Sequence, residues 1–328
     1  MIRFRAYRVA SENDGVRGRV VDATLDELSA GDVVIAAEYS SVNFKDMRVA
    51  TGTYRAPVSF PRIPGIDVAG TVAESRDARF RAGDRVLVTG YDLGVGHDGG
   101  YAGVVRVPAD WVVKVPDAFT TFEIMALGTA GFTAALCVID LERNGLRPSD
   151  APVAVTGATG GVGSIAIDIL ARLGYRVTAV TRKASERAYL QSLGAAAVIA
   201  PEDLDTGKGP VGHGTWAGAV DAVGGSVLAA LTRTLKYGAA VANCGLTGGA
   251  EINLTVLPFI LRGIKLLGID SVQLPMAPRL EAWRRLATDM KPAHLHTIAR
   301  EIRLEDLDAT FSALNQGTFR GRAVVRVG

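Results

Sequence analysis

The sequence predicts an α/β protein of two domains, one rich in β-strands and one built around a doubly wound, six-stranded parallel sheet. Three observations carry this prediction. The chain has 328 residues, a length at which about two domains are expected. Strand-like and helix-like segments alternate after residue 120, as βαβ units do. One glycine-rich turn in that region joins a strand-like run to a helix-like run, the context typical of dinucleotide-binding folds.

Composition excludes several classes of protein. With 48% hydrophobic and 21% charged residues, the chain can bury a sizeable core, so disorder is not expected. Its 36 Lys and Arg against 34 Asp and Glu give no electrostatic basis for binding nucleic acid or an acidic membrane. Two cysteines cannot form a disulfide framework or a Cys-rich zinc site. Without a signal-like N-terminus or an 18-residue apolar run, we expect a cytoplasmic protein that does not span a membrane.

The first 120 residues are typical of an irregular β-rich domain, because short apolar runs alternate with turns. Pro57, Pro61 and Pro64 indicate an ordered loop between two of these runs. The strand-like runs are residues 33–39, 70–74 and 84–88.

Residues 121–272 contain the alternating part of the chain. A helix is predicted to begin near Thr121 and to continue through Ile139. Residues 163–173 and 185–193 also have helical spacing of apolar side chains. Six strands are the number that a complete dinucleotide-binding sheet needs. The predicted strands are residues 153–156, 176–180, 197–199, 217–221, 239–243 and 265–268.

The tail after residue 272 is predicted to return to the first domain, because the termini of a domain often lie close together. It is expected to contain helices at 279–290 and 305–315 and strands at 298–303 and 323–327. The predicted domains are therefore residues 1–120 with 273–328, and residues 121–272.

The glycine-rich turn is the strongest local signal. Residues 153–164 read VAVTGATGGVGS, an apolar strand followed by glycines and the start of a helix. Glycines let the backbone approach a pyrophosphate, and the helix N-terminus offers free N–H donors and a positive dipole end. A tight turn without a ligand is the alternative interpretation. The residues expected to face the pyrophosphate are Thr159, Gly160, Gly161 and Val162.

The residues after the second predicted strand indicate which nicotinamide cofactor is bound. NAD-binding sites usually place Asp or Glu there, to accept a hydrogen bond from the ribose 2′-hydroxyl. This chain has Thr181, Arg182 and Lys183 instead. A hydroxyl and two cations suit a 2′-phosphate, so NADPH is predicted. The alternative is that both cations are simply solvated.

Taken together, these features resemble the medium-chain dehydrogenase/reductase superfamily. Residues 64–72 (PGIDVAGTV) and 80–86 (FRAGDRV) are similar to two of its recurring segments. The resemblance covers nearly the whole chain. It implies a GroES-like β-rich catalytic domain and a Rossmann domain that binds the dinucleotide.

Finer motifs resemble the acryloyl-CoA reductase group, long labelled quinone oxidoreductases. They are residues 40–46 (SSVNFKD), 156–164, 216–221, 244–249, 258–262 and 268–272. Zinc-dependent members of the superfamily carry a Cys near residue 43 and a Gly-His-Glu segment. This chain has Asn43 and Gly65-Ile66-Asp67 there, and its four His have no metal-ligand spacing. No metal is therefore expected.

The resemblance also implies candidate site residues. Asn43, Lys45, Asp46 and Tyr54 are the catalytic candidates. Lys45 and Asp46 are either a proton-donor pair or a local ion pair, and Tyr54 either donates to the substrate or packs in its loop. Phe44 has the place of a Tyr found in many relatives, so no phenol stands there. Further cofactor contacts are implied for Phe44, Leu246, Ile260, Ser271 and Asn315.

The implied reaction is NADPH-dependent reduction of the double bond of a short 2-enoyl-CoA, with acryloyl-CoA favoured. The alternatives are a quinone or enone oxidoreductase and an NADPH-binding protein without catalysis. Coenzyme A would need cations, for which Arg48, Arg55, Arg62 and Arg279 are candidates. Relatives dimerise through an edge strand, here residues 264–269, so a homodimer is expected.

Overall fold

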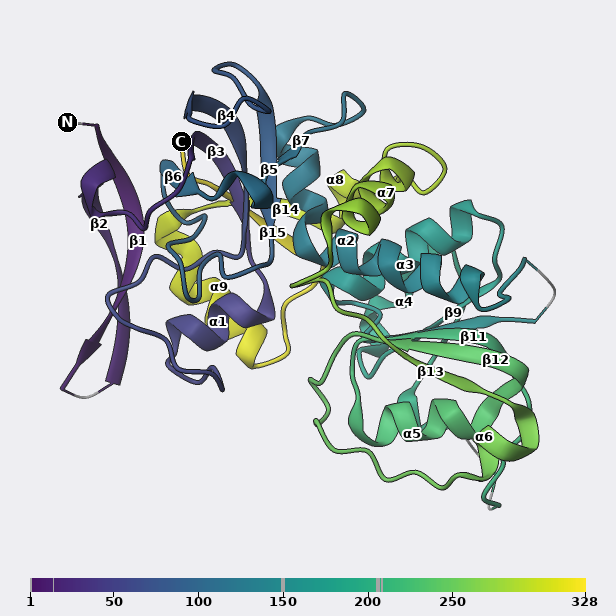
Figure 1. Cartoon of the computed structure of the whole chain (residues 1–328). Helices are drawn as coiled ribbons and strands as arrows, with labels where there is room; N and C mark the ends of the chain where they lie inside the picture. Colours follow the sequence, from purple (N-terminus) through teal and green to yellow (C-terminus); the bar gives the residue numbers. More distant parts are fainter. Residues whose placement is uncertain (1, 14, 149–150, 205–206, 208) are drawn as a thin grey trace. The chain divides into compact units, whose positions relative to one another are not determined.

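The computed structural model describes residues 2–13, 15–148, 151–204, 207 and 209–328 (Figure 1). Backbone contacts divide the chain into two compact units. The first unit comprises Met1–Thr129, Val272–Glu281 and Leu295–Gly328, and the second comprises Ala130–Ser271 and Ala282–His294.

This division differs from the predicted domains mainly at Ala282–His294, which groups with the second unit. Two contacts explain the assignment. The Trp283 ring stacks on Phe132 with centroids 5.4 Å apart, and the Arg285 guanidinium lies 2.5 Å from the Glu142 carboxylate. Both partners belong to the second unit, so these contacts anchor the segment there.

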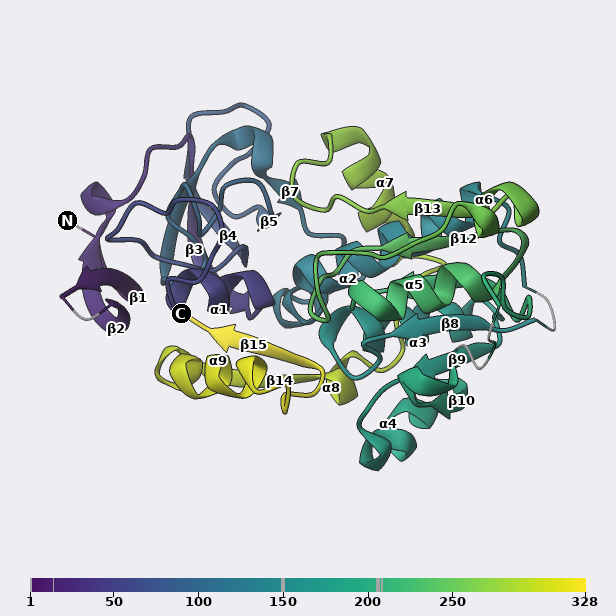
Figure 2. The ribbon, with the colours of Figure 1, turned by 90° about the horizontal axis from the view of Figure 1, so that it is seen from below.

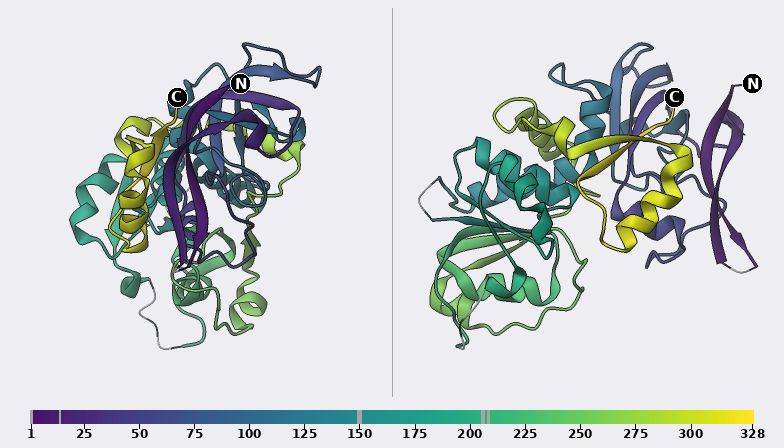
Figure 3. Two further views of the ribbon diagram at one scale, coloured as in Figure 1. Left: turned by 90° about the vertical axis from the view of Figure 1, so that its left-hand side faces the viewer. Right: turned by 180° about the vertical axis from the view of Figure 1, so that it is seen from behind.

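The first unit contains a mainly antiparallel seven-stranded sheet in the order β14-β15-β3-β4-β5-β7, with β6 also paired to β3. The chain's tail forms β14 and β15, and β15 pairs with β3 (Figure 3). The tail therefore completes the sheet that the first 120 residues begin. The strands are β3 (Val33–Ser41), β4 (Asp67–Ser75), β5 (Arg85–Thr89), β6 (Val104–Val107), β7 (Val113–Lys114), β14 (Ala299–Arg303) and β15 (Arg322–Arg326).

Sequence analysis did not predict two features of this unit. An antiparallel hairpin of β1 (Arg3–Glu12) and β2 (Gly15–Thr24) forms at the N-terminal end. A short helix, α1 (Phe44–Ala50), follows β3 directly. It begins after Asn43, whose backbone N–H donates to the Asp46 carboxylate at 2.8 Å, half of a capping box. The capping motif spans only four residues. That is too short a stretch for a helical spacing of apolar side chains to be recognised in the sequence.

Smaller elements complete the first unit, and α9 lies beside β14 and β15 at the end of the chain (Figure 2). The helices are α8 (Leu295–Ile298) and α9 (Leu307–Asn315), with 3₁₀ turns η1 (Leu25–Glu27), η2 (Ala109–Trp111) and η5 (Leu304–Asp306).

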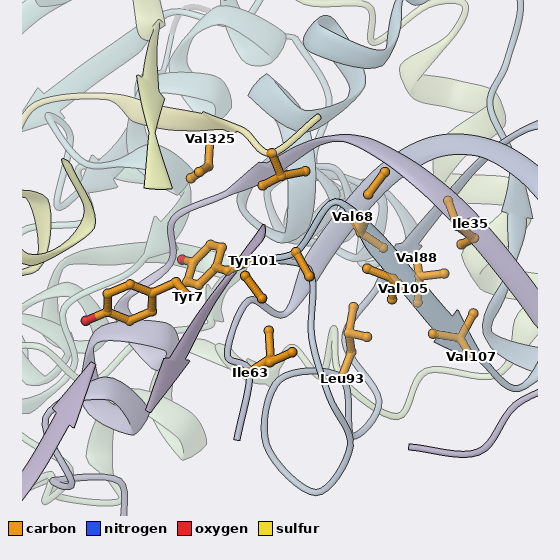
Figure 4. Packing of buried hydrophobic residues seen from close by; sticks show 14 of the residues in the cluster. Tyr7, Ile35, Ile63, Val68, Val88, Leu93, Tyr101, Val105, Val107 and Val325 are labelled. Carbon is orange, nitrogen blue, oxygen red and sulfur yellow. The ribbon is translucent and has the colours of Figure 1, made fainter. Parts of the chain in front are cut away.

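The core of the first unit lies on the strands of this sheet and on β1 (Figure 4). Aliphatic side chains from β3, β4 and β5 meet there, among them Ile35, Val68 and Val88, each fully buried. Tyr7 and Tyr101 pack edge to face, with ring centroids 6.4 Å apart. This core holds rigid the strand ends that carry the polar residues described below.

The second unit confirms the predicted Rossmann sheet. Its six strands are parallel and follow the order β10-β9-β8-β11-β12-β13, the order of a dinucleotide-binding fold. The observed bounds contain or nearly match the predicted runs. The strands are β8 (Val153–Thr156), β9 (Val177–Val180), β10 (Ala195–Ile199), β11 (Trp216–Asp221), β12 (Leu235–Asn243) and β13 (Lys265–Gly268).

Helices cover both faces of this sheet, with α3 on one face and α5 and α6 on the other (Figure 1). The core between the sheet and α5 includes Trp216, Leu228 and Leu231. The helices are α3 (Gly161–Arg172), α4 (Arg187–Ser192), α5 (Gly225–Thr234) and α6 (Leu257–Arg262), with turns η3 (Ala184–Glu186) and η4 (Pro201–Asp203). Helix α7 (Met276–Leu286) has residues in both units.

Helix α2 (Thr121–Arg143) is long and apolar enough to cross a membrane, but 89% of its apolar window is buried inside the structure. It is therefore a core helix. Gly128 interrupts it with φ 50° and ψ −152°, so two helical segments meet at a kink. This kink lies next to the boundary between the two units.

Candidate active site

A buried polar cluster lies in the first unit where β3 ends and β4 begins. Its centre is the Asp67 carboxylate, which is fully buried. The Ser41 hydroxyl donates to Asp67 Oδ2 at 2.6 Å, and the Asn43 side-chain amide donates to the same oxygen at 2.7 Å. The Thr129 backbone N–H donates to it at 2.9 Å, and the Thr129 hydroxyl donates to Oδ1. We call these residues, with Asp46 and Arg322, the Asp67 cluster.

Arg322 supplies the positive charge of this cluster. Its Nη1 donates to the Val42 carbonyl at 2.7 Å and to Asn43 Oδ1 at 3.0 Å. Its Nη2 donates to Ser41 Oγ at 2.6 Å and lies 3.5 Å from Asp67 Oδ2. Burial lowers the pKa of the guanidinium. Because Arg322 stands on β15, the returning tail is an essential part of this site.

Asp46 is a second buried carboxyl group in the cluster. Its Oδ1 accepts from the Ile66 backbone N–H at 2.8 Å, and its Oδ2 accepts from the Asn43 N–H at 2.8 Å. Burial, with the nearby charge of Asp67, raises the pKa of Asp46 to about 7. Two carboxyl groups therefore face one guanidinium, and the Asp46 carboxyl is mainly protonated below about pH 7.

The Asn43 side chain is held in one orientation by this cluster, because its amide donates to Asp67 and its carbonyl accepts from Arg322. The Asn43 side chain also hydrogen-bonds the Asp46 carboxyl, which opposes the effect of burial on the pKa of Asp46. Asn43 is half-buried, so it lies at the edge of the cluster.

Gly128 allows Thr129 to reach the cluster. A Cβ at Gly128 would lie 2.5 Å from Asp67 Oδ2 and 2.6 Å from Arg322 Nη2. With φ 50°, this position also favours glycine for its backbone. Sequence analysis missed Gly128, Thr129 and Arg322, because nothing in their local sequence indicates that they meet Asp67.

The catalytic candidates Lys45 and Tyr54 and the predicted cofactor contact Phe44 lie on α1 or in the loop after it. Phe44 is 38% exposed, with the Arg48 guanidinium 6.0 Å from its ring centroid. Lys45 is half-buried and follows in the same helical turn. Consecutive helical residues point in different directions, and Asp46 points into the cluster. Tyr54 is half-buried in the loop after α1.

The glycine-rich turn of the second unit has the geometry that a pyrophosphate needs. Gly157 has φ 59°, and a Cβ at Gly163 would lie 2.4 Å from the Gly157 carbonyl oxygen. A Cβ at Gly160 would meet one protein atom, at 3.3 Å, with open space around the rest. Helix α3 begins at Gly161, so its first N–H groups are available at this open side.

The predicted 2′-phosphate residues follow β9 directly. The Thr181 hydroxyl accepts from the Lys183 backbone N–H at 3.0 Å, which forms a tight turn. Desolvation lowers the pKa of the half-buried Lys183 ammonium. Arg182 is exposed, and in the part of the chain that the structure describes its guanidinium has no hydrogen-bond or ion-pair partner. A free cation on a fixed turn suits a phosphate.

A pocket of about 570 Å³ lies at the carboxyl ends of β12 and β13, where open α/β sheets bind their ligands. Leu246 lines it, as do Cys244 and Asp270. Thr159 is nearly buried beside the glycine-rich turn, and Ser271 is 9% exposed.

Two predicted cofactor residues lie away from this pocket. Ile260 is on α6 and 70% exposed. Asn315 is on α9 in the first unit, where it lines a separate pocket of about 620 Å³ with Arg17, Thr51 and Asp308.

Two of the four arginines considered as contacts for coenzyme A are covered in the structure and are not exposed to bind it. The Arg62 guanidinium lies 3.2 Å from the Asp98 carboxylate, and both side chains are largely buried. Arg279 is 1% exposed. In both cases tertiary packing covers a residue that local sequence cannot distinguish from a solvated one. Among the described residues, no group of three or more His, Cys, Asp or Glu is arranged to hold a metal ion.

Comparison with known proteins agrees with this architecture. Residues 29–117 match the alcohol dehydrogenase GroES-like domain family, and residues 161–288 match the zinc-binding dehydrogenase family. The chain is 47% identical over 320 residues to the acrylyl-CoA reductase AcuI of Ruegeria pomeroyi, covering 96% of each chain. The chain belongs to the medium-chain dehydrogenase/reductase superfamily.

Solved structures similar to this chain include three that are more than 40% identical to it. The yhdH oxidoreductase from Salmonella enterica, in complex with NADP, is 43% identical with a TM-score of 0.95 and covers 99% of this chain and 100% of that one. The Bacillus subtilis protein yhfP, with NAD bound, is 44% identical with a TM-score of 0.96 over the same shares. This medium-chain reductase therefore has relatives crystallised with either cofactor.

Proposed function

We propose that this chain is an NADPH-dependent reductase that converts the carbon–carbon double bond of a short 2-enoyl-CoA, acryloyl-CoA, to the saturated propanoyl-CoA. The observation that carries the proposal is the 47% identity over 96% of both chains to an acrylyl-CoA reductase. A second relative, a probable acrylyl-CoA reductase of Escherichia coli, is 45% identical over 93% of this chain and 94% of its own.

NADPH rather than NADH is supported by the turn after β9. No carboxylate is present at residues 181–183, so no negative charge there accepts from a ribose 2′-hydroxyl or repels a 2′-phosphate. Arg182 and Lys183 would hold that phosphate, and the Thr181 hydroxyl, which fixes the turn, would stand beside it. Thr159, Gly160, Gly161 and Val162 would hold the pyrophosphate.

The chain's own residues would bind, orient and stabilise charge during the reaction. Bound NADPH supplies the hydride that adds to the β-carbon of the thioester. The negative charge that then develops on the thioester oxygen needs hydrogen-bond donors aimed at it. The half-buried amide of Asn43 is the candidate donor in the Asp67 cluster. Asp67 and Arg322 keep that amide in place, and Asp46 holds a proton at its buried carboxyl group.

A quinone or enone oxidoreductase is the second candidate. It is favoured by the putative quinone oxidoreductase YhfP of Bacillus subtilis, which is 44% identical over 99% of both chains. Quinones require less of the protein, because both ring oxygens accept hydrogen bonds from water.

A homodimer in the cytoplasm is proposed with the reductase function. β13 is an edge strand of the six-stranded sheet, and exposed edge strands favour pairing with a second copy. Leu266 on β13 is an exposed apolar side chain, as are Val256, Ile260 and Leu261 at the preceding α6. A sedimentation experiment that finds only monomers would contradict this part of the proposal.

The function is tested by following NADPH absorbance in the presence of acryloyl-CoA, crotonyl-CoA or a benzoquinone, with NADH as the control cofactor. Turnover of acryloyl-CoA with NADPH, faster than with NADH, is expected. Turnover of the quinone without turnover of acryloyl-CoA would replace the first candidate with the second.

A further inference from the structure

Tyr91 has an unusual backbone at the end of β5. It is the one residue other than glycine with a positive φ, 50°, among those described. Side chains with a Cβ rarely adopt this conformation, and an aromatic one is a marked outlier. Such conformations persist where the surrounding structure fixes them, often at functional sites.

Two neighbours clamp the Tyr91 ring. The Trp111 ring stacks on it with centroids 5.4 Å apart and planes at 5°. The Arg279 guanidinium lies 4.4 Å from the Tyr91 ring centroid, a cation–π distance. The ring is therefore held in one orientation.

Arg279 is itself fixed by the residues that fix the Tyr91 backbone. Its Nη1 donates to the Thr89 carbonyl at 2.9 Å and to the Thr89 hydroxyl at 3.0 Å. Its Nη2 donates to the Val272 carbonyl at 3.1 Å, and the Tyr91 backbone N–H donates to that same carbonyl at 3.0 Å. The buried Arg279 therefore holds Tyr91 in place, because it contacts the ring and bonds the residues next to the Tyr91 backbone.

The Tyr91 loop begins beside the Asp67 cluster. Thr89 is the cross-strand partner of Asp67 in the β4–β5 ladder. The next residue, Gly90, donates its N–H to the Ile66 carbonyl at 3.0 Å. All of these residues belong to the first unit, so their arrangement does not depend on the second.

The hydroxyl groups of this region differ in what they can offer a ligand. Those of Ser40, Ser41 and Thr129 donate to Asp67, and that of Tyr101 donates to the Ser41 carbonyl. The Tyr91 hydroxyl has no hydrogen-bond partner within the described ranges, and it is not among the buried polar atoms that lack one. It is an accessible donor on a fixed ring.

We propose that the Tyr91 hydroxyl donates a hydrogen bond to the thioester carbonyl oxygen of the substrate, and that Arg279 is the positioning residue that holds Tyr91 for this contact. The inference rests on the proposed enoyl-CoA reductase function. It adds a donor from the loop that follows β5 to the candidate amide of Asn43. Tyr54, the other phenol considered, has no ring contact or hydrogen bond among the described residues that would fix its hydroxyl.

The first test replaces Tyr91 with Phe, which keeps the ring and removes only the hydroxyl. We expect kcat for acryloyl-CoA to fall about 100-fold, the usual effect of losing one donor to a developing oxyanion. The Kd for NADPH and the melting temperature should not change. Tyr237→Phe is the matched control, because Tyr237 is 84% exposed. Unchanged kcat in Y91F, or a comparable loss in Y54F with none in Y91F, would overturn the proposal.

The second test examines Arg279→Lys alone and in the Y91F background. A lysine carries its donors on one nitrogen and cannot reproduce the two-nitrogen fork that reaches Thr89 and Val272, so Tyr91 should lose its position. We expect R279K to lower kcat in the wild-type background and to have no further effect on kcat in Y91F, with the same loss of melting temperature in both. Additive losses of kcat would show that Arg279 acts independently of Tyr91, and would overturn its assigned role. If the wild-type chain does not reduce acryloyl-CoA at all, the proposed function fails before either variant is compared.

Discussion

Arg322 and Asp67 form a buried ion pair, with Nη2 3.5 Å from Oδ2 and neither side chain more than 3% exposed. They lie far apart in sequence, on β15 and β4, and Ser41 Oγ bridges them. The pair therefore joins the chain's tail to the start of the polar site.

Replacing Arg322 with Met should destabilise the protein by about 3–5 kcal/mol, because the Asp67 charge would remain buried without its partner. Urea unfolding at pH 7 measures the loss. Arg326→Met is the matched control on the same strand. The Arg326 guanidinium lies 3.8 Å from Glu301 and is 60% exposed, so a change of about 0–1 kcal/mol is expected. Equal losses in the two variants would contradict the account of the buried pair.

Gly128→Ala should be strongly destabilising, because its Cβ would lie 2.5 Å from Asp67 Oδ2. Gly145→Ala is the control that separates the effect of this clash from the effect of backbone strain. Gly145 also has a positive φ, 100°, but a Cβ there would meet no atom within 4 Å. We expect the melting temperature of G128A to fall well below that of G145A. Similar melting temperatures would show that the contact with the Asp67 cluster matters little.

The stability of the protein should depend on pH through Asp46. Its folded-state pKa is about 7, raised by burial from an ordinary value of 3.8. The folded state therefore keeps a proton that the unfolded chain releases. This contribution to stability is fully present below about pH 4 and is lost as pH rises through about 7. Asp46→Asn removes it, so the wild-type free energy of unfolding should fall more steeply between pH 5 and 8 than that of D46N. Parallel pH profiles would contradict this assignment.

Arg182→Ala should weaken NADPH binding and leave NADH binding nearly unchanged. A charge-assisted hydrogen bond contributes about 1.5–3 kcal/mol, which corresponds to roughly a 10- to 100-fold rise in the Kd for NADPH. Cofactor fluorescence titration measures both constants. An equal change for both cofactors would mean that Arg182 does not contact the 2′-phosphate.

The second unit was the more predictable part of the fold. Strands buried on both faces, such as Val153–Thr156, appear as continuous apolar runs, and helical spacing between them indicates βαβ units. The strand–turn–helix geometry of the glycine-rich turn was predictable for the same reason, because it depends on residues that are neighbours in the sequence. The predicted bounds of β8 and β13 agree with the structure.

The polar site of the first unit was less predictable, because tertiary contacts assemble it. Asn43 and Asp46 were identified from one short motif. Their partners Asp67, Thr129 and Arg322 come from β4, the kink in α2 and β15, and only the folded sheet brings them together. The burial of Arg279 was unpredictable for the same reason. This residue was considered as a contact for coenzyme A, but tertiary packing buries it beside Tyr91.

The proposed reductase function requires transfer of hydride from NADPH to the β-carbon of acryloyl-CoA. The most direct measurement is mass spectrometry of the product formed with NADPH that carries deuterium at both nicotinamide C4 positions. We expect propanoyl-CoA with one deuterium at the β-carbon and a solvent-derived proton at the α-carbon. Unreacted acryloyl-CoA, under conditions in which the same sample oxidises NADPH with a quinone, would contradict it.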